Sequence, residues 1–522
     1  MGEEQLGVLD MSLFRRKPLD ALISESSDAQ HGLKKALTTV DLIALGIGAI
    51  VGAGIFATLG AATAGGNGLP PAGPGVIVSI ALTAVACGFC ALCYAEFASL
   101  VPVAGSAYTY SYATLGELVA WIIGWDLILE YAVGNIAVAI SWAAYFRQLV
   151  AGFGLEIPAW MATDYRSTLF AAKAAALSGA SSLSPELSIA YQAHLQHPVI
   201  LGVPIIFNLL AVIITALITW LLVIGVKESA RFNNYVVVLK VLVLLFFIAV
   251  GALYVRPSNW HPFFPGGFHG VWTGASLIFF AYIGFDAIST AAEECKNPGR
   301  DMPRGIIGSL LICTVLYVGA GLVLTGMIPF KMLTGVADPL AAALSYVKQD
   351  WAAGVLALGA VIAMTAVLLV FQLGQPRILM AMSRDGLLSP WFAKIHPRYR
   401  TPYVTTILTG VFVGGCAAIA NIDEIVQLTN IGTLFAFILV CVGIMILRVR
   451  EPQRIRRFRV PFVPLTPLLG IGMCLMLMAG LPRVTWIRFI LWLLAGLFIY
   501  IIYGWRRSRL SERKDAAAGP SS

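Results

Sequence analysis

The sequence GIGAIVGAGIF, residues 46–56, places four glycines in the first long hydrophobic segment of the chain. Glycine destabilises a helix interior by up to ~1 kcal/mol relative to alanine, so this density needs an explanation. One explanation is close helix packing, because Gly48 and Gly52 form a GxxxG pair. The other is an unwound turn whose free N–H groups, at the N-terminus of a half-helix, bind a carboxylate. Packing alone leaves Gly46 and Gly54 unexplained, so we favour the unwound turn.

A second hydrophobic segment contains a similar break in FFAYIGFDAIST, residues 279–290. Unwinding around residues 283–284 would free backbone carbonyls to accept hydrogen bonds from an ammonium group. The carbonyls concerned belong to Phe280, Ala281 and Ile283. Hydrocarbon offers no water to unpaired backbone groups, so an unwound turn survives there only where it lines a protein cavity. Two broken helices at matching positions indicate the midplane substrate site of a transporter.

Asp286 follows the second break directly. A carboxylate at membrane depth is costly and is by default a sign of function. The alternative is that Asp286 caps a half-helix that begins at Ala287, and this role is compatible with a broken substrate site.

The composition is that of a membrane protein. Hydrophobic residues make up 59% of the chain and charged residues 12%, against roughly a quarter charged in soluble domains. About twelve apolar segments recur, each near the ~20 residues that cross ~30 Å of hydrocarbon. We predict spans at residues 40–62, 76–100, 118–146, 200–225, 232–254, 270–292, 305–328, 352–378, 403–420, 425–447, 463–481 and 486–505.

The basic residues predict the orientation. Most of the 35 lysines and arginines lie in the N-terminal tail, in alternate loops or in the C-terminal tail, which places both termini in the cytoplasm. The net charge of +8 is then explained by topology and attraction to anionic lipid rather than by nucleic acid. We expect no cleavable signal peptide, and either Met1 or Met11 as the true start.

Enzymatic and metal-binding functions have little support. The chain has no GxxxxGKS/T phosphate loop, no HExxH and no GxSxG motif. Cys87, Cys90 and Cys93 repeat every three residues, but the outer two lie ~240° apart around a helix, and no histidine is near. We therefore expect no enzyme activity, no cofactor and no metal site.

Four longer motifs accompany the two breaks: YAEFASLVPVAGSAYTYSYATLGE (94–117), GWDLILEY (124–131), KESARFNN (227–234) and GQPRILMAMSRDGLLSP (374–390). With these motifs in this order, the chain from about residue 33 to 507 resembles the amino acid–polyamine–organocation (APC) superfamily. The resemblance is strongest to its bacterial, cationic-amino-acid-transporter-like permeases.

The resemblance implies an all-α polytopic fold with a five-plus-five inverted repeat, broken helices 1 and 6, and two extra helices. The corresponding parts are a cytoplasmic tail (1–39), spans 1–5 (40–255, with an outer loop at 151–199), spans 6–10 (270–447), spans 11–12 (463–505) and a second cytoplasmic tail (506–522). The protein would be a multi-pass protein of the cell membrane.

The resemblance also implies the substrate contacts. The substrate carboxylate would meet the backbone amides of Gly52, Ala53 and Gly54. Its α-amino group would meet carbonyls of Ile50, Phe280, Ala281 and Ile283. Some relatives have threonine where this chain has Ala53, so a hydroxyl contact is missing here.

Lys240 lies in the middle of the fifth span, in VVVLKVLVLLFF. In proton-coupled relatives a lysine at this position occupies the region that holds a cation in sodium-coupled members. A buried ammonium is poorly solvated and can release its proton during a transport cycle. The alternative is a lysine that snorkels to an interface. Lys240 lies ~12 Å of helical rise beyond Phe232 at the inner loop, which is deep for snorkelling.

Two further positions bear on specificity. Glu130 and the neighbouring Asp126 in the third span are membrane-embedded carboxylates that either recognise a cationic side chain or pair within the protein. Phe371 in the eighth span is a bulky apolar candidate for the side-chain pocket. An apolar wall favours neutral over cationic amino acids, because an unpaired buried charge costs several kcal/mol.

We therefore expect a secondary active L-amino acid:proton symporter that works by alternating access, with neutral substrates slightly preferred over cationic ones. The alternatives are a uniporter or exchanger for cationic amino acids or polyamines, and an amino acid sensor that does not transport. Membrane lipid is an expected partner, and a small accessory membrane protein is left open.

Overall fold

The computed structural model describes residues 15–16, 37–65, 69–100, 106–178, 185–200, 203–225 and 230–508. Both candidate start residues, Met1 and Met11, lie outside the described residues, as does most of each predicted tail. In the described part, nine helices are long and apolar enough to cross a membrane, and three shorter helices are apolar as well.

These helices account for the twelve predicted segments. In chain order they are α3–η1–α4 (Thr39–Ile50, Gly54–Thr58, Leu59–Ala64), α5 (Val76–Leu100), α7–η3–α8 (Glu117–Ile128, Leu129–Val133, Gly134–Ala151), α11 (Leu209–Ile224), α12 (Ala230–Ala252), α13–η7–η8 (Gly267–Ile278, Phe279–Tyr282, Asp286–Glu294), α14 (Pro298–Met327), α16 (Asp350–Arg384), α17 (Tyr403–Ile419), α18 (Ile422–Arg450), α19 (Leu465–Ala479) and α20–η11–α21 (Arg483–Ile499, Tyr500–Gly504, Trp505–Arg507).

Shorter elements connect them. They are the helices α6 (Ser106–Thr114), α9 (Tyr165–Ser178), α10 (Pro185–Gln196) and α15 (Pro339–Tyr346), the strands β1 (Val199–Ile200) and β2 (Val203–Pro204), and the 3₁₀ turns η2 (Gly73–Gly75), η4 (Ala159–Met161), η6 (Pro257–Trp260), η9 (Phe330–Leu333) and η10 (Pro390–Ala393).

The predicted start of the fourth span at residue 200 is wrong. The strands β1 and β2 pair in antiparallel orientation there, with Val199 opposite Pro204. The helix begins only after Asn208, whose side chain accepts a hydrogen bond from the N–H of Ala211 at 3.1 Å. Hydropathy did not reveal this boundary, because the two strands are themselves apolar, whereas the Asn cap is a local signal.

The helices pack in two groups. One group joins α3, α5, α13 and α14, with α14 against α5 and α3, and α13 against α5. The other joins α8, α11, α16 and α17, with α16 against α8, α11 against α17, and further contacts of α17 with α8 and of α16 with α11. Contacts recur at an offset of five segments along the chain: first–seventh matches sixth–second, and third–ninth matches eighth–fourth. The other three contacts join segments that are themselves five apart.

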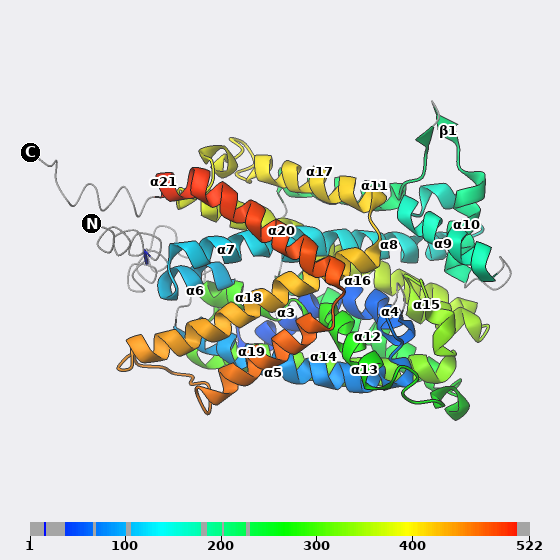
Figure 1. Cartoon of the computed structure of the whole chain (residues 1–522), viewed down its shortest axis with the longest axis horizontal. Helices are drawn as coiled ribbons and strands as arrows, with labels where there is room; N and C mark the ends of the chain where they lie inside the picture. Colours follow the sequence, from blue (N-terminus) through cyan, green and yellow to red (C-terminus); the bar gives the residue numbers. More distant parts are fainter. Residues whose placement is uncertain are drawn as a thin grey trace, which may run out of the picture.

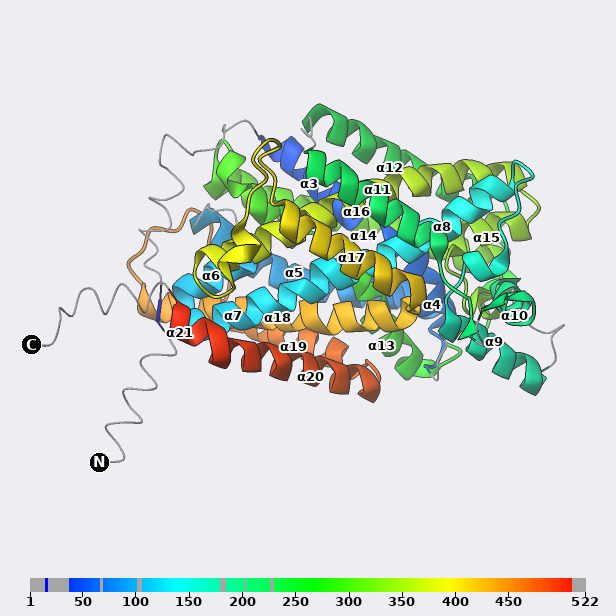
Figure 2. The ribbon, with the colours of Figure 1, turned by 90° about the horizontal axis from the view of Figure 1, so that it is seen from above.

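The molecule is elongated along its helices, with different elements at its two ends (Figure 1). Helices α9, α10 and α15 lie together at one end, here called the α9 end. Helices α6 and α21 lie at the opposite end, here called the α21 end, and the orthogonal view agrees (Figure 2). The central segments α3–η1–α4 and α13–η7–η8 lie between these ends, within the bundle.

Candidate substrate-binding site

The first predicted break is present in the backbone. Helix α3 ends at Ile50, and Val51 is extended at φ −77° and ψ 99°. The chain returns to helix with the π-helical turn η1 and continues as α4. The last carbonyls of α3 and the first N–H groups of the following half-helix therefore lie at the same interruption, since helix ends leave such groups unpaired within the helix.

The second predicted break is present as well. Helix α13 tightens into the 3₁₀ turn η7, Ile283 is extended with ψ 136°, and η8 begins at Asp286. Gly284 lies between them with φ +116°, a conformation that side chains rarely adopt. A Cβ at Gly284 would also lie 2.8 Å from the carbonyl oxygen of Ala49. This glycine is required both by its conformation and by the approach of α3.

The two breaks contact each other directly. A Cβ on Gly54 would lie 2.3 Å from Cα of Ala281 and 2.9 Å from the carbonyl oxygen of Phe280. A Cβ on Gly52 would lie 2.8 Å from Cγ2 of Val367 in α16. The two explanations of the glycine-rich stretch are therefore both realised: the helix is unwound, and its glycines also allow a close approach of backbones.

The structure gathers the predicted site residues in the buried interior. This holds for all nine predicted substrate contacts, namely Ile50, Gly52, Ala53, Gly54, Phe280, Ala281, Ile283, Asp286 and Phe371. Opposite partial charges face each other there, because the N–H groups of one half-helix and the carbonyl groups of another are adjacent. Such an arrangement complements a zwitterion, with an anionic and a cationic group a few bonds apart.

Lys240 reaches the first break. Its side chain is 1% exposed, and its Nζ donates a hydrogen bond to the carbonyl oxygen of Gly48 at 2.6 Å. That carbonyl is free because α3 ends two residues later. The burial excludes the alternative of a snorkelling lysine. Helix α12 is thereby linked to the C-terminal end of α3.

Tyr317 of α14 was missed by the sequence analysis. Its hydroxyl donates to the carbonyl oxygen of Ile50 at 3.0 Å, which is one of the carbonyls predicted to meet the substrate ammonium. A carbonyl oxygen has two lone pairs, so the contact does not prevent a second donor. Nothing in the sequence around Tyr317 signalled this role, because the hydroxyl reaches the site from 267 residues away.

Asn430 of α18 was missed in the same way. Its side-chain amide donates to the carbonyl oxygens of Ser276 at 2.8 Å and Leu277 at 3.2 Å. These carbonyls lie at the end of α13, where the helix tightens into η7. Lys240 and Tyr317 thus donate to carbonyl groups at the first break, and Asn430 donates to carbonyl groups at the end of α13.

Three acidic side chains are buried in the second break and in the third segment. Asp286 is 0% exposed, Glu130 3% and Asp126 1%. Glu130 belongs to η3, a π-helical turn in the third segment, and π-turns inside α-helices are frequent at functional sites. Within the described residues, no lysine or arginine forms an ion pair with any of the three.

Phe371 contributes an apolar wall close to the breaks. The side chain is 5% exposed, and its ring centroid lies 5.6 Å from that of Tyr131 in η3. Val367, one turn earlier on α16, is the residue that contacts Gly52. Phe371 therefore lies one helical turn from the first break, between α16 and the third segment.

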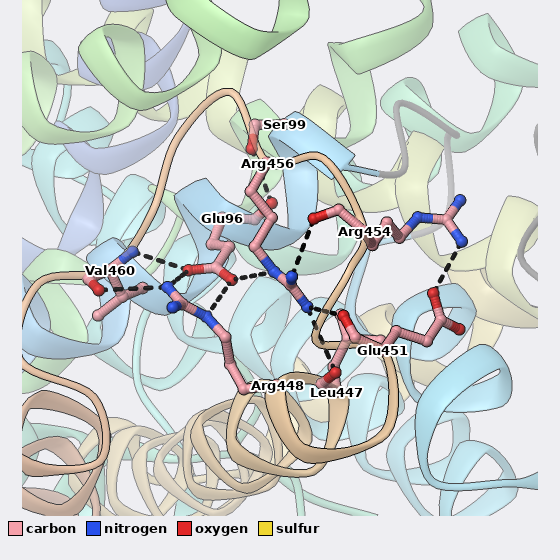
Figure 3. A network of polar contacts seen from close by, with 8 residues as sticks. All are labelled: Glu96, Ser99, Leu447, Arg448, Glu451, Arg454, Arg456 and Val460. Carbon is pink, nitrogen blue, oxygen red and sulfur yellow. Dashed lines mark hydrogen bonds and ion pairs between the residues drawn. The ribbon is translucent and has the colours of Figure 1, made fainter.

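A buried ionic network at the α21 end was also missed (Figure 3). Glu96 of α5 is 0% exposed and accepts hydrogen bonds from Arg448 at 2.8 and 2.6 Å and from Arg456 at 3.1 Å. The N–H of Val460 adds a fourth bond at 2.7 Å. One carboxylate thereby ties the end of α5 to the end of α18 and to the loop that follows it. Glu96 lies within the YAEFASL motif. It could have been found from the sequence, because a charged residue in a long apolar helix is unusual.

With twelve apolar segments and two broken helices around an interior site, the molecule is a multi-pass membrane permease. The amino acid permease family matches residues 37–504 of the chain. The chain belongs to this family, as the motifs predicted, and it is a transporter rather than an enzyme.

Three relatives illustrate the range of the family. The branched-chain amino acid permease BcaP of Bacillus subtilis (strain 168) is 46% identical over 501 residues, which cover 96% of this chain and 99% of that protein. The methylthioribose transporter of the same organism is 45% identical over 501 residues, covering 96% and 100%. The vacuolar cationic amino acid transporter 4 of Arabidopsis thaliana is 35% identical over 448 residues, covering 85% and 68%.

Proposed function

We propose that this amino acid permease is a proton-coupled symporter for neutral, aliphatic L-amino acids in the cell membrane. The observation that carries the proposal is the contact between the two breaks, which brings the N–H groups of one unwound segment next to the carbonyl groups of the other. The carboxylate of the substrate binds the amides of Gly52, Ala53 and Gly54. Its ammonium group binds carbonyls around Phe280 and Ile283.

The same proposal includes the topology. All twelve apolar segments cross the bilayer as two five-helix repeats of inverted orientation, followed by two extra helices. The packing supports a repeat, because contacts between segments recur at an offset of five along the chain. Both termini are cytoplasmic, so the α21 end faces the cytoplasm and the α9 end faces the outside.

The preference for aliphatic side chains rests on two observations. Phe371 and Val367 present apolar surface beside the first break, and an apolar wall rejects an unpaired charge. In addition, a relative named a branched-chain amino acid permease is similar over nearly its full length. Thermal-shift measurements against all common L-amino acids test this preference, and the largest stabilisation is expected from isoleucine, leucine or valine.

Two competing substrates have specific support. Glu130, Asp126 and Asp286 are buried and have no ion pair among the described residues, which favours a cationic side chain that would neutralise them. A relative named a methylthioribose transporter is nearly as similar as the branched-chain permease. Stabilisation by arginine and lysine alone, or by methylthioribose alone, would contradict the aliphatic proposal and select one of these.

Coupling depends on Lys240. A protonated Lys240 donates to Gly48 and holds the end of α3 in the arrangement that binds substrate. Loss of the proton weakens this charge-assisted hydrogen bond and releases the first break, which favours discharge of the substrate. Transport therefore follows the proton gradient.

Uptake of labelled isoleucine into proteoliposomes, in sodium-free buffer with the inside pH varied, tests the coupling. The native protein should accumulate substrate only with an inward proton gradient, and Lys240→Met should lose this accumulation. Lys331→Met is the matched control, because it removes an exposed ammonium group of η9 instead of a buried one. Gradient-driven uptake by Lys240→Met, or a sodium requirement of the native protein, would contradict the mechanism.

A further inference from the structure

A cavity of about 520 Å³ opens at the α9 end and lies outside the site described above. It is lined by α9 and α10, by the starts of α18 and α20, and by the segment after the first break. Its volume falls within the range of small-molecule sites. The cavity is large enough for an amino acid.

The floor of this cavity touches the substrate site. Ala57 and Thr58 of η1 and Leu277 of α13 line it. The hydroxyl of Thr58 donates to the carbonyl oxygen of Gly54 at 2.5 Å, and Gly54 packs against the second break. A molecule in the cavity is therefore one side chain away from the predicted position of the substrate carboxylate.

The walls carry charges of both signs. Glu424, at the start of α18, forms ion pairs with Arg166 of α9 and with Arg488 of α20, the latter at 3.2 Å. The side chains are partly solvated, with 30% of Glu424, 54% of Arg166 and 33% of Arg488 exposed. Ion pairs of this kind contribute little stability, so their members can exchange partners with a charged ligand at small cost.

Apolar side chains accompany these charges. Leu169 and Phe170 of α9 line the cavity and remain 38% and 42% exposed. Helix α9 is held in place by a hydrogen bond from Asn421 to the hydroxyl of Ser167 at 3.0 Å. The cavity thus combines an anionic group, cationic groups and uncovered apolar surface on a fixed framework.

We propose that this cavity is a second binding site for the transported amino acid, occupied before the molecule passes to the broken helices. The ligand's carboxylate binds Arg166 and Arg488 in place of Glu424, and its ammonium group binds the released Glu424. Its aliphatic side chain covers Leu169 and Phe170. The inference rests on the proposed function, which supplies the substrate class and places the α9 end outside.

Equilibrium binding of radiolabelled L-isoleucine to the purified full-length protein tests the proposal. The native protein should bind two equivalents per chain. Glu424→Gln and Phe170→Ala should each halve this stoichiometry and retain the central site. Gly54→Val should also retain one equivalent, held in the cavity, and the double variant Gly54→Val/Glu424→Gln should retain none. Gel filtration and a melting curve establish that each variant is folded.

Lys331→Gln is the matched control, because Lys331 is an exposed basic residue of η9 that does not line the cavity. This variant should bind two equivalents. A native stoichiometry of one, or two equivalents in both Glu424→Gln and Phe170→Ala, would overturn the second site and leave the proposed function intact. No isoleucine binding by the native protein, with stabilisation by another substrate class, would instead overturn the proposed function.

Discussion

The two ends of the molecule hold their helices together in opposite ways. At the α9 end, Glu424 pairs with two arginines that are 54% and 33% exposed, beside an open cavity. At the α21 end, Glu96 pairs with Arg448 and Arg456, which are 23% and 2% exposed, and both of its carboxylate oxygens accept hydrogen bonds from within the protein (Figure 3). The ends therefore differ in how strongly their ionic contacts resist separation, because burial removes the solvent that would replace a lost partner.

Backbone contacts strengthen the closure of the α21 end. The N–H of Leu37 donates to the carbonyl oxygen of Glu294 at 2.9 Å, and Lys296 returns a bond to Leu37 at 3.0 Å. The hydroxyl of Thr39 donates to Asp301 at 2.7 Å. These contacts join the start of α3 to the end of η8 and the start of α14.

The largest effect is expected from the buried network. Glu96→Gln keeps the size of the side chain but leaves Arg448 and Arg456 without a counter-charge. Breaking one member of a buried ion network costs about 3–5 kcal/mol, so the melting temperature in detergent should fall strongly. If the melting temperature falls no further than it does for Glu424→Gln, the ionic contacts of the two ends contribute equally to stability.

The second effect concerns the contact between the breaks, midway between the ends. Gly54→Val places side-chain atoms against the backbone of Ala281. Overpacking of this kind costs about 1–3 kcal/mol, and it should abolish amino acid binding at the central site. Gly88→Val in α5 is the matched control, since no atom lies within 4 Å of a Cβ there. Equal binding by both variants would exclude the close approach as a requirement.

A smaller effect is expected at the carbonyl of Ile50. Tyr317→Phe removes one hydrogen bond of 3.0 Å, worth about 1 kcal/mol. Tyr282→Phe is the comparison, because the Tyr282 hydroxyl makes only longer bonds, of 3.2 and 3.4 Å. Melting curves with and without substrate should show a larger fall in melting temperature for Tyr317→Phe than for Tyr282→Phe. A larger fall for Tyr282→Phe would contradict the role of Tyr317 at the break.

The smallest effect is expected at the α9 end. Removing the exposed pair by Arg166→Gln, Glu424→Gln and the double variant should give a coupling energy below about 1 kcal/mol. Raised salt should reduce it further, since exposed charges are screened. A double-mutant cycle on melting data measures this energy. A coupling energy as large as the destabilisation by Glu96→Gln would show that ionic contacts hold the α9 end together as strongly as the α21 end.

Much of the site could be predicted because its signals are local. Unwound backbone is predicted by a run of glycines in one apolar segment and by a glycine followed by an acidic residue in another. Neither prediction requires knowing where the neighbouring helices lie. The lysine in the middle of the fifth span was recognised for the same reason, as a costly charge among apolar neighbours. Each of these features breaks a rule that an isolated membrane helix would obey.

The remaining contacts could not be predicted, because tyrosine, asparagine and threonine are tolerated in membrane helices and their presence does not indicate which group they contact. That Tyr317 meets Ile50, and that Asn430 meets the end of α13, follows from how α14 and α18 pack, and those contacts span 267 and 154 residues. The fourth segment shows the same limit, since an apolar hairpin and an apolar helix have the same hydropathy.

By itself the sequence determined the class of fold, the places where two helices break and the residue that reaches the first break. These properties follow from the solvation of single groups, since hydrocarbon penalises each charge and each unpaired backbone group wherever it lies. Only the tertiary structure decided which carbonyl each donor satisfies and which end of the molecule is closed. Both depend on how closely helices far apart in the chain approach each other. A buried polar group stabilises the protein when a partner lies within hydrogen-bond distance, and it is costly when none does.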